Sequence, residues 1–397
     1  MSENLLEAAQ HRAASVVDLA QRLVRAPSRG GIDPYEPVLT ILEDWLTEHL
    51  LPHRRLRSPD GTLVGLLVEV AGASPGPWWA LDACLDTAPF GDESAWSFSP
   101  TSGDIEQGWL LGRGSADSKL AAATFVHIAA DVRARAHELA GGLAVLLDVD
   151  EHTGGFGGAL AYLADPQATR PDGVMIGYPG LDEVVVGGRG LWRAQVKVHG
   201  ASGHSGSSRP TVGAISRAAH LIHALDNADL PTPADGDPFA LPPKISVTAC
   251  HSGEGYSVVP DLCTLNIDIR TTPAYTEHDA HHLVHAATAA LDRNHPTQHP
   301  TTVNTVATWP PFQLGPGQEP AATLLRAAKK TGLEPRPKTA GPSNIGNLLA
   351  LHGIPATAGF GVPYEGLHGI DERAHLTELP HVYAVYHQTV LDLLRQA

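Results

Sequence analysis

The order of apolar segments along the chain constrains its fold more than any other feature. Short apolar runs that are typical of buried strands alternate with segments whose apolar residues have helical spacing. The strand-like runs are residues 63–71, 78–86, 142–150 and 173–179, and the helical segments include residues 9–25 and a long one that starts at residue 117. This alternation predicts an α/β domain with a mostly parallel central sheet.

The pattern changes near residue 190 and resumes near residue 310. In between, the expected order is strand 190–200, helix 211–228, strands 244–250 and 261–270, helix 277–292 and strand 301–307. That order resembles a split βαβ unit. We therefore expect a catalytic domain made of residues 1–190 and 306–397, with an inserted ferredoxin-like α+β satellite domain at residues 191–305. The length of 397 residues suits two domains.

Composition narrows the partners and the compartment. Hydrophobic residues make up 43% of the chain and the formal net charge is -16, which argues against nucleic acid or an anionic membrane surface as a partner. No run approaches the roughly 20 apolar residues that cross a bilayer. Three cysteines are too few to staple a secreted chain of this length, and the first residues lack an apolar signal core, so we expect the cytoplasm.

Polar residues gather in four segments, most of them just after expected strands. They are Cys84 and Asp86 in CLDTAP, Asp117 in GRGSADSK, the pair Glu151 and His152 in DEHTGG, and His368 in LHGIDE. In open α/β sheets, functional residues tend to lie beyond the carboxyl ends of the strands. We therefore expect these side chains to form one site.

These segments, with YP at 178–179, resemble the motifs of a known family in order and spacing. The motifs are H-x-D-x-x-P, G-R-G-x-x-D-x-K, D-E-E-x-G-G, E-P and a late His, and GASGHSGSSRP and GYSVVPDLCTLNIDIR resemble two further ones. The family is the di-zinc amidohydrolases and peptidases that include acetylornithine deacetylase, succinyl-diaminopimelate desuccinylase, aminoacylase and glutamate carboxypeptidase. The resemblance covers nearly the whole chain.

The resemblance implies a set of metal ligands that is partly substituted here. Asp117 matches the carboxylate that bridges two zinc ions. Cys84 and Tyr178 stand where the first zinc has His and an acidic residue, whereas His152, in place of Glu, and the matching His368 would serve the second.

The two metal positions differ in quality. Cys84 also fits as a small buried strand residue, and Tyr178, with an ordinary pKa of about 10, fits as a hydrogen-bond donor that lines the site. Two histidines and one carboxylate suit a single zinc or another divalent ion. The alternative is that both histidines hydrogen-bond Asp117 with no metal present. We expect at most one tightly held ion per subunit, most simply zinc.

The resemblance also implies catalytic and binding roles. Glu151 matches the general base, Asp86 the carboxylate that orients the first histidine, and His204 the histidine that reaches the partner subunit's active site and stabilises the oxyanion. Glu151 also fits as a surface residue at a strand end, and His204 as a loop cap. The residues expected to line the substrate pocket are Arg189 and Arg270, which would grip a carboxylate, Ser257 in place of the usual Asn, Tyr178, and Ser343 and Asn344 in the GPSN turn.

Three hypotheses follow for function. The first is an amide-bond hydrolase, acting on an N-acyl amino acid or small peptide with a metal-activated water and Glu151 as base. The second is a metal-independent relative that uses Glu151, His152, Asp117 and Tyr178 for a transfer, condensation or cyclisation in specialised metabolism. The third is a non-catalytic carboxylate-binding protein. In each case the partner is a small carboxylate-bearing molecule, and the resemblance implies a homodimer formed through the satellite domain.

Overall fold

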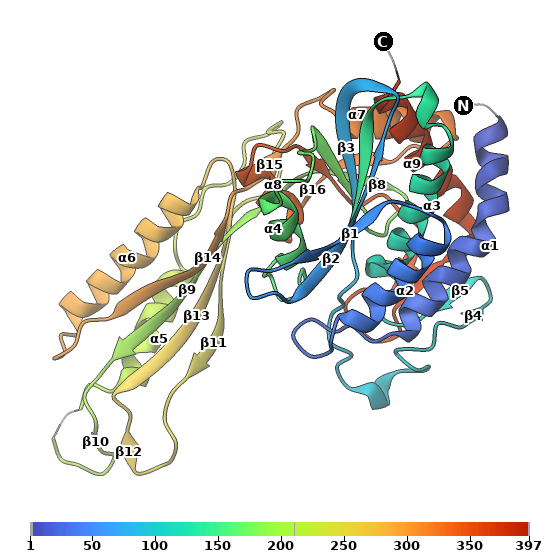
Figure 1. Ribbon diagram of the computed structural model, residues 1–397. Helices are drawn as coiled ribbons and strands as arrows, with labels where there is room; N and C mark the ends of the chain where they lie inside the picture. The colour runs from blue at the N-terminus through green and yellow to red at the C-terminus, as the bar shows by residue number, and fades with distance from the viewer. Residues whose placement is uncertain (1–2, 210, 396–397) are drawn as a thin grey trace. The chain divides into compact units, whose positions relative to one another are not determined.

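The structure is a computed structural model that describes residues 3–209 and 211–395. The chain divides into two compact units, which are described separately (Figure 1). The larger unit consists of Met1–Val186, Leu314–Lys338 and Gly353–Ala397, and the smaller unit of Gly187–Gln313 and Thr339–His352.

The larger unit is built on a mixed sheet with the strand order β1-β2-β6-β3-β7-β17. The strands are β1 (His53–Arg57), β2 (Leu63–Ala71), β3 (Ser74–Cys84), β6 (Ala140–Asp148), β7 (Gly173–Ile176) and β17 (Ala356–Thr357). From β6 to β17 neighbouring strands are parallel, as the sequence predicts, whereas β1 and β2 pair antiparallel. Only two residues join β2 to β3, which is too short for the crossover that parallel strands need.

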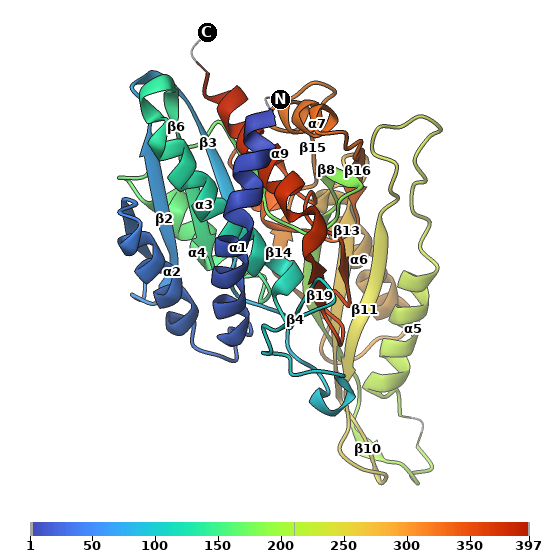
Figure 2. The same ribbon diagram turned by 90° about the vertical axis from the view of Figure 1, so that its right-hand side faces the viewer.

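Helices cover both faces of this sheet. On one face α1, α3 and α9 pack against one another, and on the other α4 lies against β1, β2 and β6 (Figure 2). The helices of the larger unit are α1 (Glu3–Arg25), α2 (Glu36–Glu48), α3 (Leu120–Ala134), α4 (Gly157–Ala164), α7 (Ala321–Lys330) and α9 (Leu379–Leu393). Helix α3 is buried over most of its surface because its alanine-rich sequence lets neighbouring helices approach closely.

Two further sheets are smaller than the central one. One has the antiparallel order β18-β19-β5-β4 and the other the order β15-β8-β16. Their strands are β4 (Ile105–Glu106), β5 (Trp109–Leu111), β18 (Tyr364–Glu365), β19 (Arg373–His375), β8 (Glu183–Gly188), β15 (Phe312–Gln313) and β16 (Arg336–Ala340). The turn between β18 and β19 carries His368.

The smaller unit has the expected split βαβ order. Its strands form an antiparallel sheet in the order β11-β13-β9-β14, and two helices pack on one face of it. These elements are β9 (Gly190–His199), α5 (Ala214–Asp226), β11 (Lys244–His251), β13 (Leu262–Thr271), α6 (Glu277–Asn294) and β14 (Thr302–Trp309). Helix α6 begins at a capping box between Thr276 and Asp279.

A short two-stranded arm extends from this sheet. It pairs β10 (Gly203–His204) with β12 (Val258–Val259) antiparallel, and both lie at one end of the smaller unit (Figures 1 and 2).

The main segment of the smaller unit is Gly187–Gln313, whereas the boundaries expected from the sequence were near residues 190 and 305. Residues 339–352, which include α8 (Ile345–Leu351), belong to the smaller unit rather than to the last catalytic segment. The backbone carbonyl of Arg189 accepts hydrogen bonds from Ser343 Oγ and Asn347 Nδ2, which hold this segment there. Such backbone contacts leave no pattern in the sequence.

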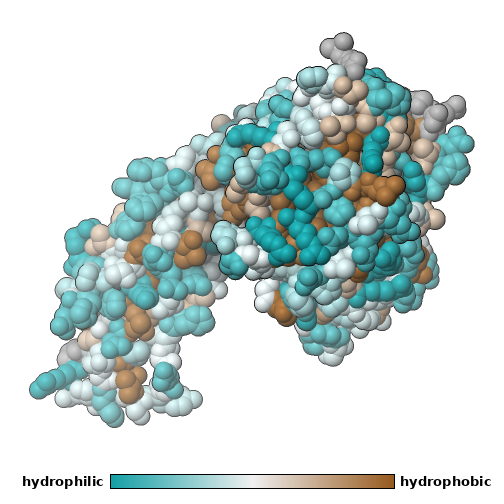
Figure 3. Space-filling view, viewed as in Figure 1, coloured by the Kyte–Doolittle hydropathy of each residue, from teal (hydrophilic) through white to brown (hydrophobic). Residues whose placement is uncertain are grey.

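The surface is consistent with a charged chain. In the view of Figure 3 hydrophilic residues dominate, with small hydrophobic areas on both units. Within residues 3–209 and 211–395, none of the helices combines the length and the apolar character needed to cross a bilayer.

Candidate active site

The carboxyl ends of three neighbouring strands set the position of the site. In the parallel part of the sheet Cys84 of β3 is level with Asp148 of β6, and Asp82 with Ile176 of β7. The segments that follow these strands therefore leave the sheet at the same edge. This edge brings together the side chains of Cys84, Asp86, Glu151, His152 and Tyr178, as the sequence predicts.

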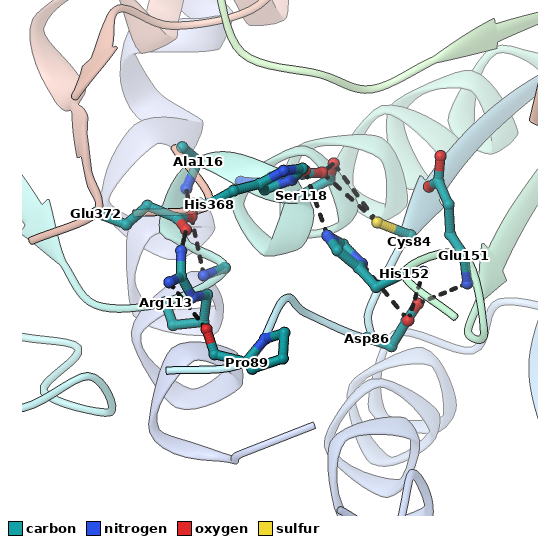
Figure 4. Close-up of polar contacts among 12 residues, drawn as sticks. Cys84, Asp86, Pro89, Arg113, Ala116, Ser118, Glu151, His152, His368 and Glu372 are labelled. Atoms are coloured by element: carbon teal, nitrogen blue, oxygen red, sulfur yellow. Dashed lines mark hydrogen bonds and ion pairs between the residues drawn. The ribbon is translucent and has the colours of Figure 1, made fainter. Parts of the chain in front are cut away.

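Asp86 fixes the turn that follows β6. Its side chain is fully buried, and its two carboxylate oxygens accept the backbone N–H groups of Glu151 at 3.1 Å and His152 at 2.9 Å (Figure 4). Asp86 Oδ2 also lies 3.5 Å from His152 Nδ1. The resemblance implies that Asp86 orients the first histidine of the family motif. Position 84 is a cysteine in this chain, and Asp86 contacts His152 instead.

Asp117 is held in place from behind by a buried ion pair. The Glu372 carboxylate pairs with Arg113, and its Oε1 accepts the backbone N–H groups of Gly114, Ala116 and Asp117. Breaking a buried pair of this kind by removing one partner costs about 3–5 kcal/mol. The loop that carries Asp117 is thus rigidly anchored before α3 begins.

His368 reaches Asp117 from a strained turn. Its φ is +57°, a left-handed conformation that costs a non-glycine residue about 1–2 kcal/mol. Asp371, two residues before β19 and also at positive φ, stabilises the turn by accepting the backbone N–H of Ser97 at 2.8 Å. The His368 side chain is half exposed, so this edge of the cluster is open to solvent.

The Oδ2 atom of Asp117 faces two imidazoles. His368 Nε2 donates to it at 2.8 Å, and His152 Nε2 lies 3.5 Å away. The two rings meet edge to face with centroids 5.2 Å apart. Burial alone would raise the pKa of Asp117, but both histidines outweigh it and lower that pKa well below its usual range. Likewise, burial would lower the pKa of His152, yet Asp117 and Asp86 raise it to about 11.

The Oδ1 atom of Asp117 faces a thiol and a hydroxyl. Ser118 Oγ lies 2.8 Å from it and also 2.8 Å from the carbonyl oxygen of Gly177, while the Cys84 thiol donates to it at 3.7 Å (Figure 4). Burial raises the pKa of Cys84 well above its usual value, and the carboxylates of Glu151 and Asp117 raise it further. On this side of Asp117 the Cys84 thiol therefore keeps its proton.

Tyr178 borders the same region as a neutral phenol. Burial raises its pKa above the usual 10, and the negative charges of Asp117 and Glu151 add to that effect. A phenolate ligand to a metal would have to overcome both causes.

Glu151 lies on the Cys84 side of the cluster. Burial and the negative charge of Asp117 raise the pKa of Glu151 to about 7, although the positive charge of His152 and a contact with Cys84 oppose the rise. A carboxyl group with this pKa can both take up and release a proton near neutral pH.

Donor atoms in this cluster form two possible metal-binding groups among the described residues. In the first group, Asp117, His152 and His368 offer ligand atoms that lie within 4.8 Å of one another. Two imidazole nitrogens and a carboxylate fit a divalent ion, and Asp86 beside Nδ1 supplies the outer carboxylate that such a histidine usually has. The second group is Cys84, Asp86 and His152, whereas the ligand set expected from the resemblance was Cys84, Asp117 and Tyr178.

The smaller unit brings together only part of the predicted substrate pocket. Arg270 donates to Asp268 at 2.7 Å and to Ser343 Oγ at 3.2 Å. Burial lowers the pKa of Arg189, and the charge of Arg270 lowers it further. Asn344 is occupied elsewhere, because its side chain accepts the N–H of Gly346 and caps α8.

The other two predicted residues of the smaller unit lie on the arm. His204 is exposed on β10, and its Nδ1 accepts the N–H of Gly206 at 3.0 Å. Ser257 precedes β12 and is exposed, and its carbonyl accepts the N–H of Ser205 at 2.9 Å. The structure therefore places Ser257 beside His204 on the arm, away from the residues that contact Arg270.

Sequence reasoning missed the residues that support Asp117. Arg113 and Glu372 stand inside the motif segments GRGSADSK and LHGIDE, so their position was the signal that could have found them. Ser118 was missed as well, although it follows Asp117 directly. Asp82 and Asp148 were hidden in apolar strand sequences; burial raises the pKa of both well above the usual range.

Comparison with known proteins agrees with this geometry. Residues 80–392 match the model of peptidase family M20/M25/M40. The succinyl-diaminopimelate desuccinylase of Cereibacter sphaeroides is 26% identical over 388 residues, covering 95% of this chain and 98% of that protein.

Solved structures show the same fold. A tripeptidase from Staphylococcus aureus superposes with a TM-score of 0.77 at 17% identity, covering 97% of this chain and 99% of that chain. A dinuclear metal-binding peptidase from Bacillus subtilis superposes with a TM-score of 0.70 at 16% identity, with coverage of 97% and 99%. The family match spans most of the chain and includes every motif segment of the larger unit, and on that ground this chain belongs to peptidase family M20/M25/M40.

Proposed function

We propose that this protein hydrolyses the amide bond of a small N-acyl amino acid or peptide with a free carboxylate, with one divalent metal ion held by Asp117, His152 and His368. The observation that carries the proposal is the group of three ligand atoms within 4.8 Å of one another, beside a carboxyl group whose pKa is raised to about 7. Two imidazoles and a carboxylate suit zinc.

A bound ion would supply Lewis-acid polarisation of the scissile carbonyl and would make a water molecule more acidic. Glu151 takes the proton of the attacking water and later passes it to the leaving amine. Asp86 keeps Glu151 and His152 in position through their backbone N–H groups. The resemblance assigns stabilisation of the oxyanion to the partner subunit's His204.

The carboxylate of the substrate is proposed to bind the arginines of the smaller unit. Arg189 Nε is buried and has no hydrogen-bond partner among the described residues, and its pKa is lowered first by burial and then by Arg270. An anion placed between two like charges relieves their repulsion, and arginine offers paired donors to a carboxylate.

Replacing Arg270 by Ala tests this binding role. We expect binding of a carboxylate-bearing substrate to weaken by about 2–5 kcal/mol, measured by calorimetry or through KM. The exposed Arg293 in α6 provides the matched control, since Arg293→Ala removes one positive charge at a different place. Equal weakening in both variants would remove the claim of a specific carboxylate pocket.

Hydrolysis itself is tested with a panel of N-acetyl and N-succinyl amino acids and short peptides. The protein is purified without chelator, and the released amine is quantified before chelation, after chelation and after zinc is restored. We expect release that stops with chelator and returns with zinc. If the metal-restored protein releases no amine from any member of the panel, the proposal is wrong.

One observation favours a second candidate, a metal-independent acid–base enzyme of the same fold. Without a metal, Asp117 and His152 already form a stable charge pair, because the pKa of His152 is raised to about 11 and that of Asp117 is lowered. Glu151, His152, Asp117 and Tyr178 would then exchange protons in a transfer, condensation or cyclisation. Activity that is unchanged by chelator would support this candidate over the first.

Two further expectations, on the oligomeric state and on the compartment, accompany the proposal. The resemblance supports a homodimer formed through the smaller unit, which light scattering of the purified chain would test. The free cysteines fit a reducing cytoplasm, the compartment that we propose; fractionation of the source cells would test it.

A further inference from the structure

Two cysteines of the smaller unit touch each other across a pair of strands, apart from any residue assigned so far. Cys250 on β11 and Cys263 on β13 have their sulfur atoms 3.6 Å apart. Cys250 is exposed, whereas Cys263 is completely buried in the core between the sheet and its helices. The pair therefore has one thiol that reagents can reach and one that only Cys250 can reach.

A β-bulge brings the two thiols to the same face. The register of β11 against β13 shifts between Val247, which faces Ile267, and Ala249, which faces Asn266. One extra residue reverses the alternation of side chains along a strand. Cys250 consequently lies opposite Leu265 on the core face, diagonal to Cys263, instead of pointing to the other side.

The distance is compatible with a covalent bond after a small movement. A disulfide bond measures about 2.05 Å, so the sulfur atoms must approach by about 1.6 Å from their 3.6 Å separation. Diagonal neighbours in a sheet lie about 7–8 Å apart, near the upper limit for a disulfide, so closure needs a small backbone shift as well as side-chain rotation. β11 can make this shift because it pairs on one side only and ends at His251.

The pair also stands at the base of the arm. The residues between the two cysteines, 251–262, include β12, which pairs with β10. The backbone bond from Ser205 to Ser257 extends this pairing by one residue. A bond between Cys250 and Cys263 would close residues 251–262 into a loop. It would thereby restrict β12, the strand that pairs with the His204 strand β10.

We propose that Cys250 and Cys263 form a reversible modification site that reacts with low-molecular-weight disulfides. The Cys250 thiolate attacks one sulfur of the disulfide R–S–S–R, which breaks that bond and releases one thiolate that takes up a proton. The Cys263 thiolate then attacks the sulfur of Cys250, displaces the second R–S group, and leaves an intramolecular disulfide. Two cysteine thiols are oxidised and one small disulfide is reduced to two thiols.

The environments of the two sulfurs set this order of events. Burial, with a further contribution from Cys250 beside it, raises the pKa of Cys263 to about 12. The thiolate is the nucleophile in exchange, so the exposed Cys250 reacts first. Cys263 reacts only once an activated sulfur lies next to it.

Treatment of the full chain with oxidised glutathione tests the proposal by intact mass and peptide mapping. We expect the wild type to lose two hydrogens and to show a Cys250–Cys263 cross-link that dithiothreitol reverses. Cys263→Ser should stop at a stable glutathionyl adduct on Cys250, because no second thiol displaces it. Cys250→Ser should show no modification at Cys263 in the folded protein.

The arm gives an independent readout. In the cross-linked wild type, hydrogen exchange of residues 251–262 should slow relative to the reduced protein, and the glutathionyl adduct of Cys263→Ser should show no such slowing. A stable adduct on wild-type Cys250, or equal reactivity of Cys263 in Cys250→Ser, would overturn the proposal. These measurements need neither a metal nor turnover, so they stand apart from the proposed hydrolase function.

Discussion

The two oxygens of the Asp117 carboxylate have very different surroundings. Oδ2 faces the rings of His368 and His152, at 2.8 Å and 3.5 Å, whereas Oδ1 faces the hydroxyl of Ser118 and the thiol of Cys84, at 2.8 Å and 3.7 Å. On the first side, imidazoles can release their protons and accept a divalent ion in exchange. On the second side, burial keeps the Cys84 thiol protonated.

From these surroundings we expect that the bridging position of Asp117 does not by itself provide two metal sites. The Glu372 carboxylate anchors the loop that carries Asp117 through backbone N–H groups and contacts neither carboxylate oxygen of Asp117 in these bonds. What separates the two sides is the chemistry of the neighbours. We therefore predict one tightly bound ion on the Oδ2 side, and variants that change one neighbour at a time test this prediction.

The largest effect is expected for the histidines of the Oδ2 side. His152→Ala and His368→Ala should each lose the tightly bound metal, since each removes one of three ligands, whereas Cys84→Ala should retain it. Elemental analysis of desalted protein gives the stoichiometry. Two equivalents in the wild type would show that the Oδ1 side also holds a metal, and loss of metal in Cys84→Ala would show that the Oδ1 side is the better site.

Glu151→Gln should lower kcat by roughly 10²–10⁴-fold, the usual contribution of a general acid–base group. The metal content should stay that of the wild type, because Glu151 is not among the Oδ2 ligands. Glu254→Gln, a change at an exposed position of the smaller unit, is the control for the loss of one negative charge. Near-normal turnover by Glu151→Gln would contradict the role of Glu151 as the proton-transfer group in either enzyme hypothesis.

Asp86→Asn should weaken metal binding by about 10–100-fold, the usual cost of removing an outer carboxylate from a metal-binding histidine. Competition with a chromophoric chelator measures this change. The exposed Asp182 gives the matched control through Asp182→Asn. An unchanged metal affinity in Asp86→Asn would contradict the role of Asp86 as the outer carboxylate of His152.

The smallest effect is expected from repairing the Oδ1 side. The double variant Cys84→His with Tyr178→Glu restores the residue types that the family resemblance places there. We expect a second, weaker equivalent of metal at higher free zinc, detected by titration calorimetry. If the stoichiometry stays at one metal ion per chain, Ser118 or the backbone excludes the second ion, rather than the residue types at positions 84 and 178.

Much of the fold could be predicted from apolar patterns. The run at 63–71 coincides with β2, and the strand expected at 190–200 differs from β9 by one residue at its end. β1 escaped because Leu56 is its only apolar residue, and α4 because its eight residues are too few to show a helical period. Residues 339–352 were misplaced because their attachment depends on the backbone carbonyl of Arg189, which is the same in every residue.

The candidate site divides in the same way. Motif order alone pointed to Asp117, His152 and His368, which the structure brings within ligand distance of one another. The contacts of Asp86 could not be read from its type, because they depend on which backbone N–H groups reach it. Ser257 and Asn344 were expected in a pocket from motif position, but local turns and caps determine where they lie.

His152 belongs to both groups of possible ligands, and this limits how many metal ions the two groups can hold at once. A neutral imidazole has one lone pair available for coordination, on one of its two nitrogens. Nε2 faces Asp117 and Nδ1 faces Asp86, on opposite edges of the ring. An ion coordinated through either nitrogen leaves a proton on the other, so the two groups cannot be filled together. The tautomer of this single ring thus determines which of the two groups is available to a metal ion.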